Sequence, residues 1–331
     1  MDKGGKSLDG NKGRMQPVHM MESYTDPLGL RVELDFSLQF VDTRRPDIKM
    51  GLDRTKERLI GWLEKYLKNH PSIKRSLDPM RKSEGNAYTQ AVSGKRLDFR
   101  VAGQNIPNRG FIRYDNGSKV FVDMKTRLLQ WPGIKKTVEA VFGAEQTSRI
   151  YDNDDNIISI GVKAATGGHE FSHSALEGPN TREKLGPHLY NELWKIKSNV
   201  IPAAAMNALL DPEERADYIK SILATSLRSL SQRDNETQRP YYNSAVVIIN
   251  ELARASIIRI VNEKWTIVIN EKTMDDFRKG SEGIFCELLE IYDTENPEVD
   301  HEFLQTYVTE AELSKPIVEL LKKLGVKTDF S

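Results

Sequence analysis

The chain has 331 residues, 38% of them hydrophobic and 29% charged, and its 48 basic and 48 acidic side chains give a formal net charge of zero. This composition is typical of a globular protein, and the zero net charge argues against binding DNA or RNA through bulk electrostatics. The sequence has no apolar run of about 18 residues and no apolar leader, and its single cysteine, Cys286, excludes an internal disulfide framework. We therefore expect a cytoplasmic protein without a membrane segment, in which Cys286 is a buried core thiol.

The N-terminal part predicts a tail, a strand, a helix and a small sheet. Residues 1–27 lack periodicity and are rich in Gly, Lys, Ser and Met, which indicates a flexible tail. Apolar residues alternate from Arg31 to Phe40, as in a half-buried strand, and then recur at helical spacing from Leu52 to Leu67. Turn signals separate short apolar runs between Ala87 and Asp123, which favours an antiparallel meander.

The rest of the chain predicts mainly helices. We expect helices over 134–142, over two segments between 190 and 230 and over 274–291, with short strands over 156–162 and 266–269. The strongest element is Tyr241 to Val261, whose lack of a polar face predicts a helix through the centre of the molecule. Residues 292–331 predict a small helical C-terminal lobe. These patterns together predict an α+β fold with an N-terminal mixed sheet, a central buried helix and that lobe.

Two charged residues interrupt the predicted central helix. Glu251 and Arg254 are three positions apart and therefore share one face of an otherwise apolar helix. Burying a carboxylate and a guanidinium is unfavourable unless the two groups are paired or used in chemistry. They form either an ion pair that joins two elements or a catalytic acid or base with a cationic partner.

The sequence around this pair resembles a known enzyme family. Ile248 to Arg254, preceded by Tyr241 and Tyr242, resembles the Glu-Ala-Ala-Arg helix of the ribosome-inactivating proteins, which remove an adenine from ribosomal RNA. Upstream, Leu185 to Leu193 is similar to that family's Gly-Gly-x-Tyr-x-x-Leu segment and places Tyr190 at the tyrosine position.

Weaker likenesses extend the resemblance over roughly Leu28 to Leu289. Gly94 to Val101 and Asn105 to Phe111 are similar in order to the family's strand and hairpin motifs, although Pro107 falls at the first stacking tyrosine. Asp275 to Lys279 resembles the segment that carries the active-site tryptophan, and Phe277 stands at that position.

The resemblance implies a fold, an activity and a site. Residues 28–291 would form an N-glycosidase-like domain with the fold of the ribosome-inactivating proteins and an insertion at about 124–184. Glu251 would stabilise an oxocarbenium-like transition state or orient water, and Arg254 would assist departure of the purine. Tyr190 would stack on the flipped-out adenine, with Phe277 as the floor of the pocket. The loss of one stacking ring would weaken activity, since such stacking contributes about 1–3 kcal/mol per base.

The same resemblance implies partners. The chain would be an rRNA N-glycosylase that acts without a cofactor as a monomer on the large-subunit RNA of the ribosome. It would inhibit protein synthesis, in the manner of a plant-defence toxin.

A second motif predicts different chemistry. His169-Glu170-Phe171-Ser172-His173 matches the His-Glu-x-x-His pattern, which on a helix places two imidazoles on one face to bind zinc, with the glutamate as general base. Glu192 is a candidate third ligand. Gly167 and Gly168 before the motif and Gly178-Pro179 after it leave room for only a short helix. We therefore prefer the N-glycosidase and keep two alternatives: a zinc metalloprotease, and a catalytically weakened homologue that binds RNA or a protein partner.

Overall fold

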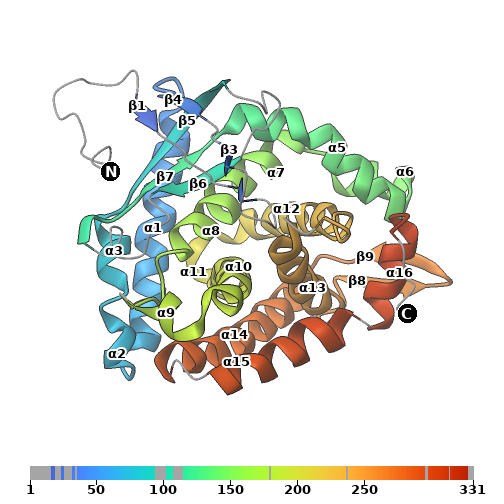
Figure 1. Ribbon diagram of the computed structural model, residues 1–331. Coiled ribbons are helices and arrows are strands. Elements are labelled where there is room, and N and C mark those ends of the chain that lie inside the picture. The colour runs from blue at the N-terminus through green and yellow to red at the C-terminus, as the bar shows by residue number, and fades with distance from the viewer. Residues whose placement is uncertain are drawn as a thin grey trace.

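The computed structural model describes residues 16–18, 24–25, 32–33, 36–93, 102–106, 115–178, 180–235, 238–294, 297–312 and 314–326 (Figure 1). Its strands are β1 (Gln16–Val18), β2 (Tyr24–Thr25), β3 (Val32–Glu33), β4 (Phe36–Val41), β5 (Glu84–Ser93), β6 (Gly103–Ile106), β7 (Lys119–Val122), β8 (Ile258–Val261) and β9 (Lys264–Ile267).

Six long helices make up most of the remaining structure: α1 (Pro46–Leu67), α5 (Met124–Phe142), α10 (Pro187–Ala204), α12 (Arg215–Leu230), α13 (Arg239–Arg254) and α14 (Glu271–Thr294). The shorter ones are α2 (Pro71–Lys74), α3 (Leu77–Lys82), α6 (Ala144–Ile150), α7 (Asp154–Ile160), α8 (Gly167–Ser172), α9 (Thr181–Leu185), α11 (Met206–Leu209), α15 (Pro297–Leu304) and α16 (Lys315–Lys323). Segments η1 (Gly161–Thr166) and η4 (Gln305–Glu310) are π-helical, and η2 (Pro212–Glu214) is a 3₁₀ turn.

The main sheet has five strands in the order β1-β4-β5-β7-β6. β4 pairs antiparallel with β1 and β5, β7 pairs antiparallel with β6, but β5 and β7 run parallel. The antiparallel meander predicted over residues 87–123 is therefore wrong for β5 and β7, because parallel neighbours need a crossover instead of a tight turn, whereas β6 and β7 do pair antiparallel. In Figure 1 the sheet lies at one side of the molecule, the β8–β9 hairpin lies at the opposite side near α16, and most of what lies between is helical.

The predicted α+β class, with the fold of the ribosome-inactivating proteins, is wrong. Helices dominate the described chain, and the segment 124–184, expected as an insertion, is built almost entirely from α5, α6, α7, η1, α8 and α9. The strand predicted over 156–162 lies in α7 and η1, because its apolar residues face several neighbouring helices at once and a short apolar run does not distinguish strand from buried helix. Among the described residues, no helix combines the length and apolarity needed to cross a membrane.

The predicted division of the chain into a tail, a main domain and a C-terminal lobe lies only partly within the described residues. Most of the tail predicted over 1–27 lies outside them, as do the motif segments 94–101 and 107–111. In the C-terminal part, α15 packs against α14, while η4 and α16 pack against α13. The boundary between residues 28–291 and 292–331 stays a prediction.

Helices α7, η1 and α8 follow one another without a break, and glycines let them approach their neighbours closely. A Cβ at Gly161 would lie 2.1 Å from Oγ of Ser221 on α12, and one at Gly168 would lie 2.9 Å from Cβ of Pro202 on α10. The sequence predicts that Gly168 leaves room for only a short helix at the motif. In the structure Gly161 and Gly168 are the points where neighbouring helices come close to one another.

Helix α13 is buried without a break from Tyr242 to Leu252, as its apolar run predicts, but it ends at Arg254. Ser256 has a φ of 59°, a left-handed conformation that terminates a helix. The β-branched residues that follow form strand β8, and Asn262 and Glu263, both with positive φ, turn the chain into β9. A two-residue turn of this kind matches the twist of a hairpin. The predicted helix to Val261 was therefore one element too long.

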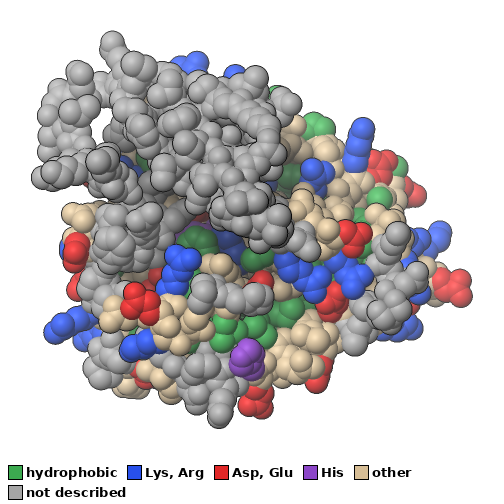
Figure 2. Space-filling model, in the orientation of Figure 1, with side chains coloured by type: hydrophobic (Ala, Val, Ile, Leu, Met, Phe, Trp, Pro, Cys, Tyr) green, Lys and Arg blue, Asp and Glu red, His purple; other side chains and the backbone are tan. Residues whose placement is uncertain are grey.

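Basic residues of α1 pair with carboxylates of the segment before α12. Arg54 contacts Asp211 and Glu214 at 3.1 and 2.7 Å, and Arg58 contacts Asp211 at 3.0 Å. These arginines therefore join two elements of the fold. Figure 2 shows both signs of charge spread over one face of the described molecule, with hydrophobic side chains in its middle.

Cys286 is exposed on α14, so the predicted core thiol is wrong. Its neighbour Phe285 and the following Leu288 and Leu289 take the inward positions of this helix. The helical period places residue 286 on the opposite side.

The glycine contacts predict a stability difference between two alanine variants. We expect Gly168→Ala to lower the free energy of unfolding by about 1–3 kcal/mol, because its Cβ would push α8 away from Pro202. Gly61→Ala is the control, since Gly61 lies on α1 with nothing within 4 Å of its Cβ position. That variant should gain up to about 1 kcal/mol through helix propensity. Urea unfolding measures both, and equal effects at the two sites would contradict the packing argument.

Candidate functional site

His169, Glu170 and His173 come together on α8 and the residue that ends it. One ligand atom from each lies within 4.8 Å of the others, and no other group of three such side chains was found among the described residues. The two imidazole rings meet edge to face with centroids 4.6 Å apart, and Nε2 of His173 is 3.7 Å from Oε2 of Glu170. The helix thus gathers two nitrogen donors and one carboxylate at a single point.

Helix α10 orients the first imidazole. Nδ1 of His169 lies 2.7 Å from Oδ1 of Asn199, whose amide nitrogen donates to Oγ of Ser244 on α13 at 2.6 Å. The amide oxygen can only accept, so Nδ1 carries the proton and Nε2 presents a lone pair. The hydroxyl of Ser198 lies 3.4 Å from that Nε2.

Burial sets the protonation of two site residues. It lowers the pKa of His169 to about 3, an effect reinforced by the charges of Lys195 and Arg127 and opposed by the hydrogen bond to Asn199. Burial raises the pKa of Glu170 to about 7, and the charge of Lys195 opposes this rise. His169 is therefore a neutral imidazole at physiological pH, the form that can bind a metal ion.

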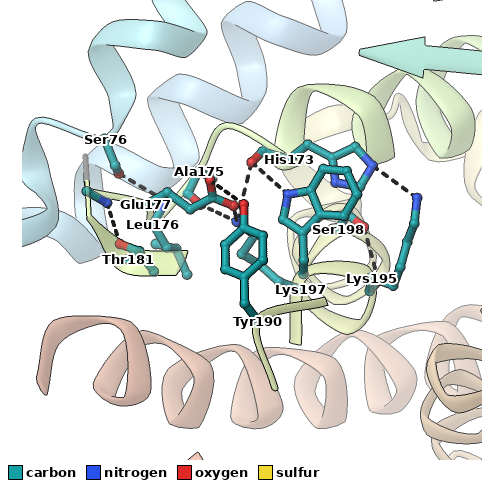
Figure 3. Close-up of polar contacts among 12 residues, drawn as sticks. Ser76, His173, Ala175, Leu176, Glu177, Thr181, Tyr190, Lys195, Lys197 and Ser198 are labelled. Atoms are coloured by element: carbon teal, nitrogen blue, oxygen red, sulfur yellow. Dashed lines mark hydrogen bonds and ion pairs between the residues drawn. The ribbon is translucent and has the colours of Figure 1, made fainter. Parts of the chain in front are cut away.

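The second imidazole is held by an aromatic ring. His173 stacks on Trp194 of α10 with centroids 3.7 Å apart, and Nε1 of Trp194 donates to the His173 carbonyl at 3.4 Å. Nζ of Lys195 lies 3.5 Å from Nε2 of the same histidine (Figure 3). An ammonium group can only donate, so it faces the lone pair of that nitrogen.

A buried lysine fixes the segment that follows α8. Lys197 is fully buried, and its Nζ contacts Oε1 of Glu177 at 2.6 Å, the Ala175 carbonyl at 2.7 Å and the His173 carbonyl at 3.4 Å. The hydroxyl of Tyr190 donates to the other oxygen of Glu177 at 3.0 Å. Figure 3 shows these side chains converging between α10 and the chain after α8.

The same segment contains a residue in an unusual conformation. Leu176 has a φ of 63°, which costs energy for a residue with a branched side chain. Its backbone nitrogen donates to Oγ of Ser76 at 3.0 Å, and its neighbours are held by Lys197. The contacts on both sides of Leu176 keep this turn in place.

Strand β6 lies against the carboxylate of the site. Nδ2 of Asn105 donates to the backbone carbonyl of Glu170 at 2.5 Å, and a Cβ at Gly103 would be 3.0 Å from Oε1 of Glu170. β6 is the outer strand of the main sheet in the described residues. The site therefore lies between an edge strand and helix α10.

The donor set fits a divalent metal ion in part. Two imidazoles close together at one helix, one of them oriented through its other ring nitrogen, are typical of a zinc site. Glu192, the candidate third ligand, is buried on α10, but its Oε2 accepts a hydrogen bond from Asn243 at 2.7 Å. It does not belong to the group that contains His169, Glu170 and His173.

Glu251 and Arg254 form an ion pair at the end of α13. Their side chains are 2.5 Å apart and differ in exposure, with 5% of Glu251 and 63% of Arg254 accessible to solvent. The Glu251 carboxylate lies against α14, since a Cβ at Gly280 would be 2.2 Å from its Oε2. Burial raises the pKa of Glu251, although Arg254 opposes this.

The two predicted adenine-binding rings are both buried. Tyr190 donates to Glu177 and stacks at 6.3 Å on Trp194, whereas Phe277 lies inside the hydrophobic core on α14. Tyr190 thus contacts Glu177 and Trp194, whereas Glu251 contacts Arg254 and packs against α14.

Sequence reasoning missed Lys195, Ser198 and Asn199. Ser198 and Asn199 follow Lys195 by three and four positions, so all three residues lie on the face of α10 that meets α8. Their sequence signal is that they are polar residues on the inward side of a largely apolar helix. This pattern indicates a functional site only when α10 is known to lie beside α8.

Comparisons with known proteins identify the fold. The chain is similar to the structure of dipeptidyl-peptidase III from Caldithrix abyssi, with 17% identity and a TM-score of 0.68 over 95% of this chain. It is also similar to dipeptidyl-peptidase III from Corallococcus sp. strain EGB, with 12% identity and a TM-score of 0.70 over 97% of this chain. The match spans 59% of each of those chains. No protein-family model matches the sequence. No curated protein matches it either.

These structures overturn the resemblance to ribosome-inactivating proteins. The fold is that of two peptidases, so the rRNA N-glycosylase activity, the ribosomal partner and the toxin function inferred for the chain are wrong. The cause of the error is physical. A carboxylate and a guanidinium three residues apart on an apolar helix also arise as an ordinary ion pair at a helix end.

The buried position of Glu251 predicts a pH-dependent stability. Its pKa is raised in the folded state, so ionisation opposes folding, and stability is lost as pH rises from the ordinary glutamate range through the folded pKa. We expect Glu251→Gln to be more stable than the wild type at pH 7, with a difference that disappears below about pH 4. Urea unfolding at both pH values tests this, with exposed Glu139 as the Glu→Gln control. A destabilised Glu251→Gln variant at pH 7 would show that the pair with Arg254 dominates.

The ion pair of Lys197 predicts a large loss of stability on its removal. Lys197→Met leaves the buried Glu177 carboxylate without its cation, and we expect a loss of about 3–5 kcal/mol in the free energy of unfolding. The double variant Lys197→Met, Glu177→Gln should recover part of this loss, because no net charge then remains buried. Urea unfolding of both variants provides the measurement, and no recovery in the double variant would refute the electrostatic explanation.

Proposed function

We propose that this chain is a metal-dependent hydrolase of peptides, with His169 and His173 as metal ligands and Glu170 as general base. One observation carries the proposal: α8 and His173 bring the two imidazoles and the carboxylate together, with ligand atoms within 4.8 Å. The alternative zinc-peptidase interpretation of the sequence is thus better supported than the N-glycosidase.

The protein groups around the histidines support ligand roles. The Asn199 amide holds Nδ1 of His169 and directs Nε2 into the site, and Trp194 holds the plane of the His173 ring. A zinc ion bound by these nitrogens would supply Lewis acidity, polarising a carbonyl and making water more acidic.

Glu170 is placed to accept and return a proton. Its backbone is fixed by Asn105, and its carboxylate lies 3.7 Å from the ligand nitrogen of His173. A general base held close to a metal ligand can take a proton from water and deliver it to a leaving amine.

Peptides are the substrate class that the surroundings favour. The similar structures are dipeptidyl-peptidases III, and β6, the outer strand of the sheet within the described part of the chain, lies beside Glu170. An extended peptide can pair with such an edge through its backbone. The single cysteine fits a reducing compartment, and we place the protein in the cytoplasm.

Metal titration and peptide cleavage test the proposal. We expect zinc to bind to the full chain with one ion per molecule at saturation and to support release of short peptides or dipeptides from a peptide library. His169→Ala should abolish zinc binding, whereas Glu170→Gln should keep zinc and lose at least about a hundredfold in rate. Cleavage that persists in Glu170→Gln, or in the presence of a chelator, would refute the assignment.

A further inference from the structure

The Lys195 side chain contacts one of the three side chains of the candidate metal site. It extends from α10 so that Nζ lies 3.5 Å from Nε2 of His173 (Figure 3). Its charge also acts on both other members of the group, lowering the pKa of His169 and of Glu170. One ammonium group therefore contacts His173 and acts electrostatically on His169 and Glu170, the two other members of the candidate metal site.

Two aromatic rings hold the lysine in this position. Nζ lies 4.7 Å from the ring centre of Trp194 and 4.4 Å from that of Tyr241 on α13. Cation–π contacts at these distances stabilise an ammonium group. Tyr241 is 38% exposed and Lys195 is itself partly exposed, so the ammonium group lies close to the surface of the molecule.

The ammonium and a metal ion need the same electron pair. Nε2 of His173 has a single lone pair, which either accepts a hydrogen bond from Lys195 or binds a metal. A divalent cation beside this nitrogen would also be repelled by the ammonium, and a partly buried setting strengthens that repulsion.

We propose that Lys195 is a built-in competitor for the metal at the His169–Glu170–His173 site. A divalent ion binds there only after the lysine has moved away from His173, so the wild-type chain holds zinc weakly. Lys195 thus controls metal loading from a residue that is not itself a ligand. The inference rests on the proposed function for the identity of the ligands.

Zinc titration by calorimetry of the full chain tests this proposal. Lys195→Met removes the ammonium while keeping an unbranched apolar side chain, and we expect zinc to bind at least ten times more tightly than to the wild type. Lys195→Glu places a carboxylate on the same face of α10, and we expect a gain of a hundredfold or more. Lys195→Arg keeps the positive charge and is the matched control, with affinity as low as in the wild type.

Two further measurements locate the effect. The gain should disappear when His173→Ala is combined with Lys195→Met, because the released lone pair belongs to that histidine. Thermal unfolding in a chelator should show that each variant is folded before zinc is added. Zinc affinity of Lys195→Met equal to the wild type, or a gain that survives His173→Ala, would overturn the proposal.

Peptide cleavage by the same proteins separates this inference from the proposed function. Tighter zinc binding in Lys195→Met without cleavage by any variant would support the role of Lys195 and overturn the peptidase assignment. If the wild type binds zinc tightly and cleaves peptides, and Lys195→Met changes neither property, the peptidase assignment is supported and the role of Lys195 is overturned. Absence of zinc binding in every variant would overturn both.

Discussion

The buried ammonium of Lys197 is the constraint on which the geometry of the site depends. A charge with no exposure to solvent is tolerated only where oxygen atoms surround it, and here Glu177 and two backbone carbonyls do so. Those oxygens all belong to the segment immediately after α8. The electrostatic requirement of one side chain on α10 therefore determines where the chain leaves α8, and with it the position of His173.

The contact between α8 and α10 also explains how the site is oriented. Glycine at position 168 brings the helices together, and Asn199 and Trp194 then fix the two imidazole rings. Each of these residues contacts a candidate ligand from outside, as groups that orient metal ligands do. Lys195 is the exception on this face, because its charged end lies against the candidate ligand atom itself, Nε2 of His173.

Local patterns predicted the elements and failed on their assembly. The periodicity of α1 and the apolar run of α13 are properties of single segments, and both helices lie close to where they were expected. The likeness around Glu251 and Arg254 was also local, and it gave a wrong family because an ion pair at a helix end needs no catalytic partner. The motif at His169 was visible in the sequence, but the parallel pairing of β5 with β7 and the position of Lys195 depend on residues far apart in the chain. Periodicity contains no information about such pairings.

The π-helical segment η1 has a consequence for how the motif works. A π-turn holds one more residue than an α-turn, so everything after it is rotated by about 100° relative to an uninterrupted helix. His169 and His173 follow η1 directly, and α10 meets them on one side only. The His-Glu-x-x-His pattern alone therefore does not form this site. The number of residues between Asp154 and His169 decides whether the imidazoles point toward α10 or away from it. A relative with the same letters and a spacer shorter by one residue would present a different side of the helix.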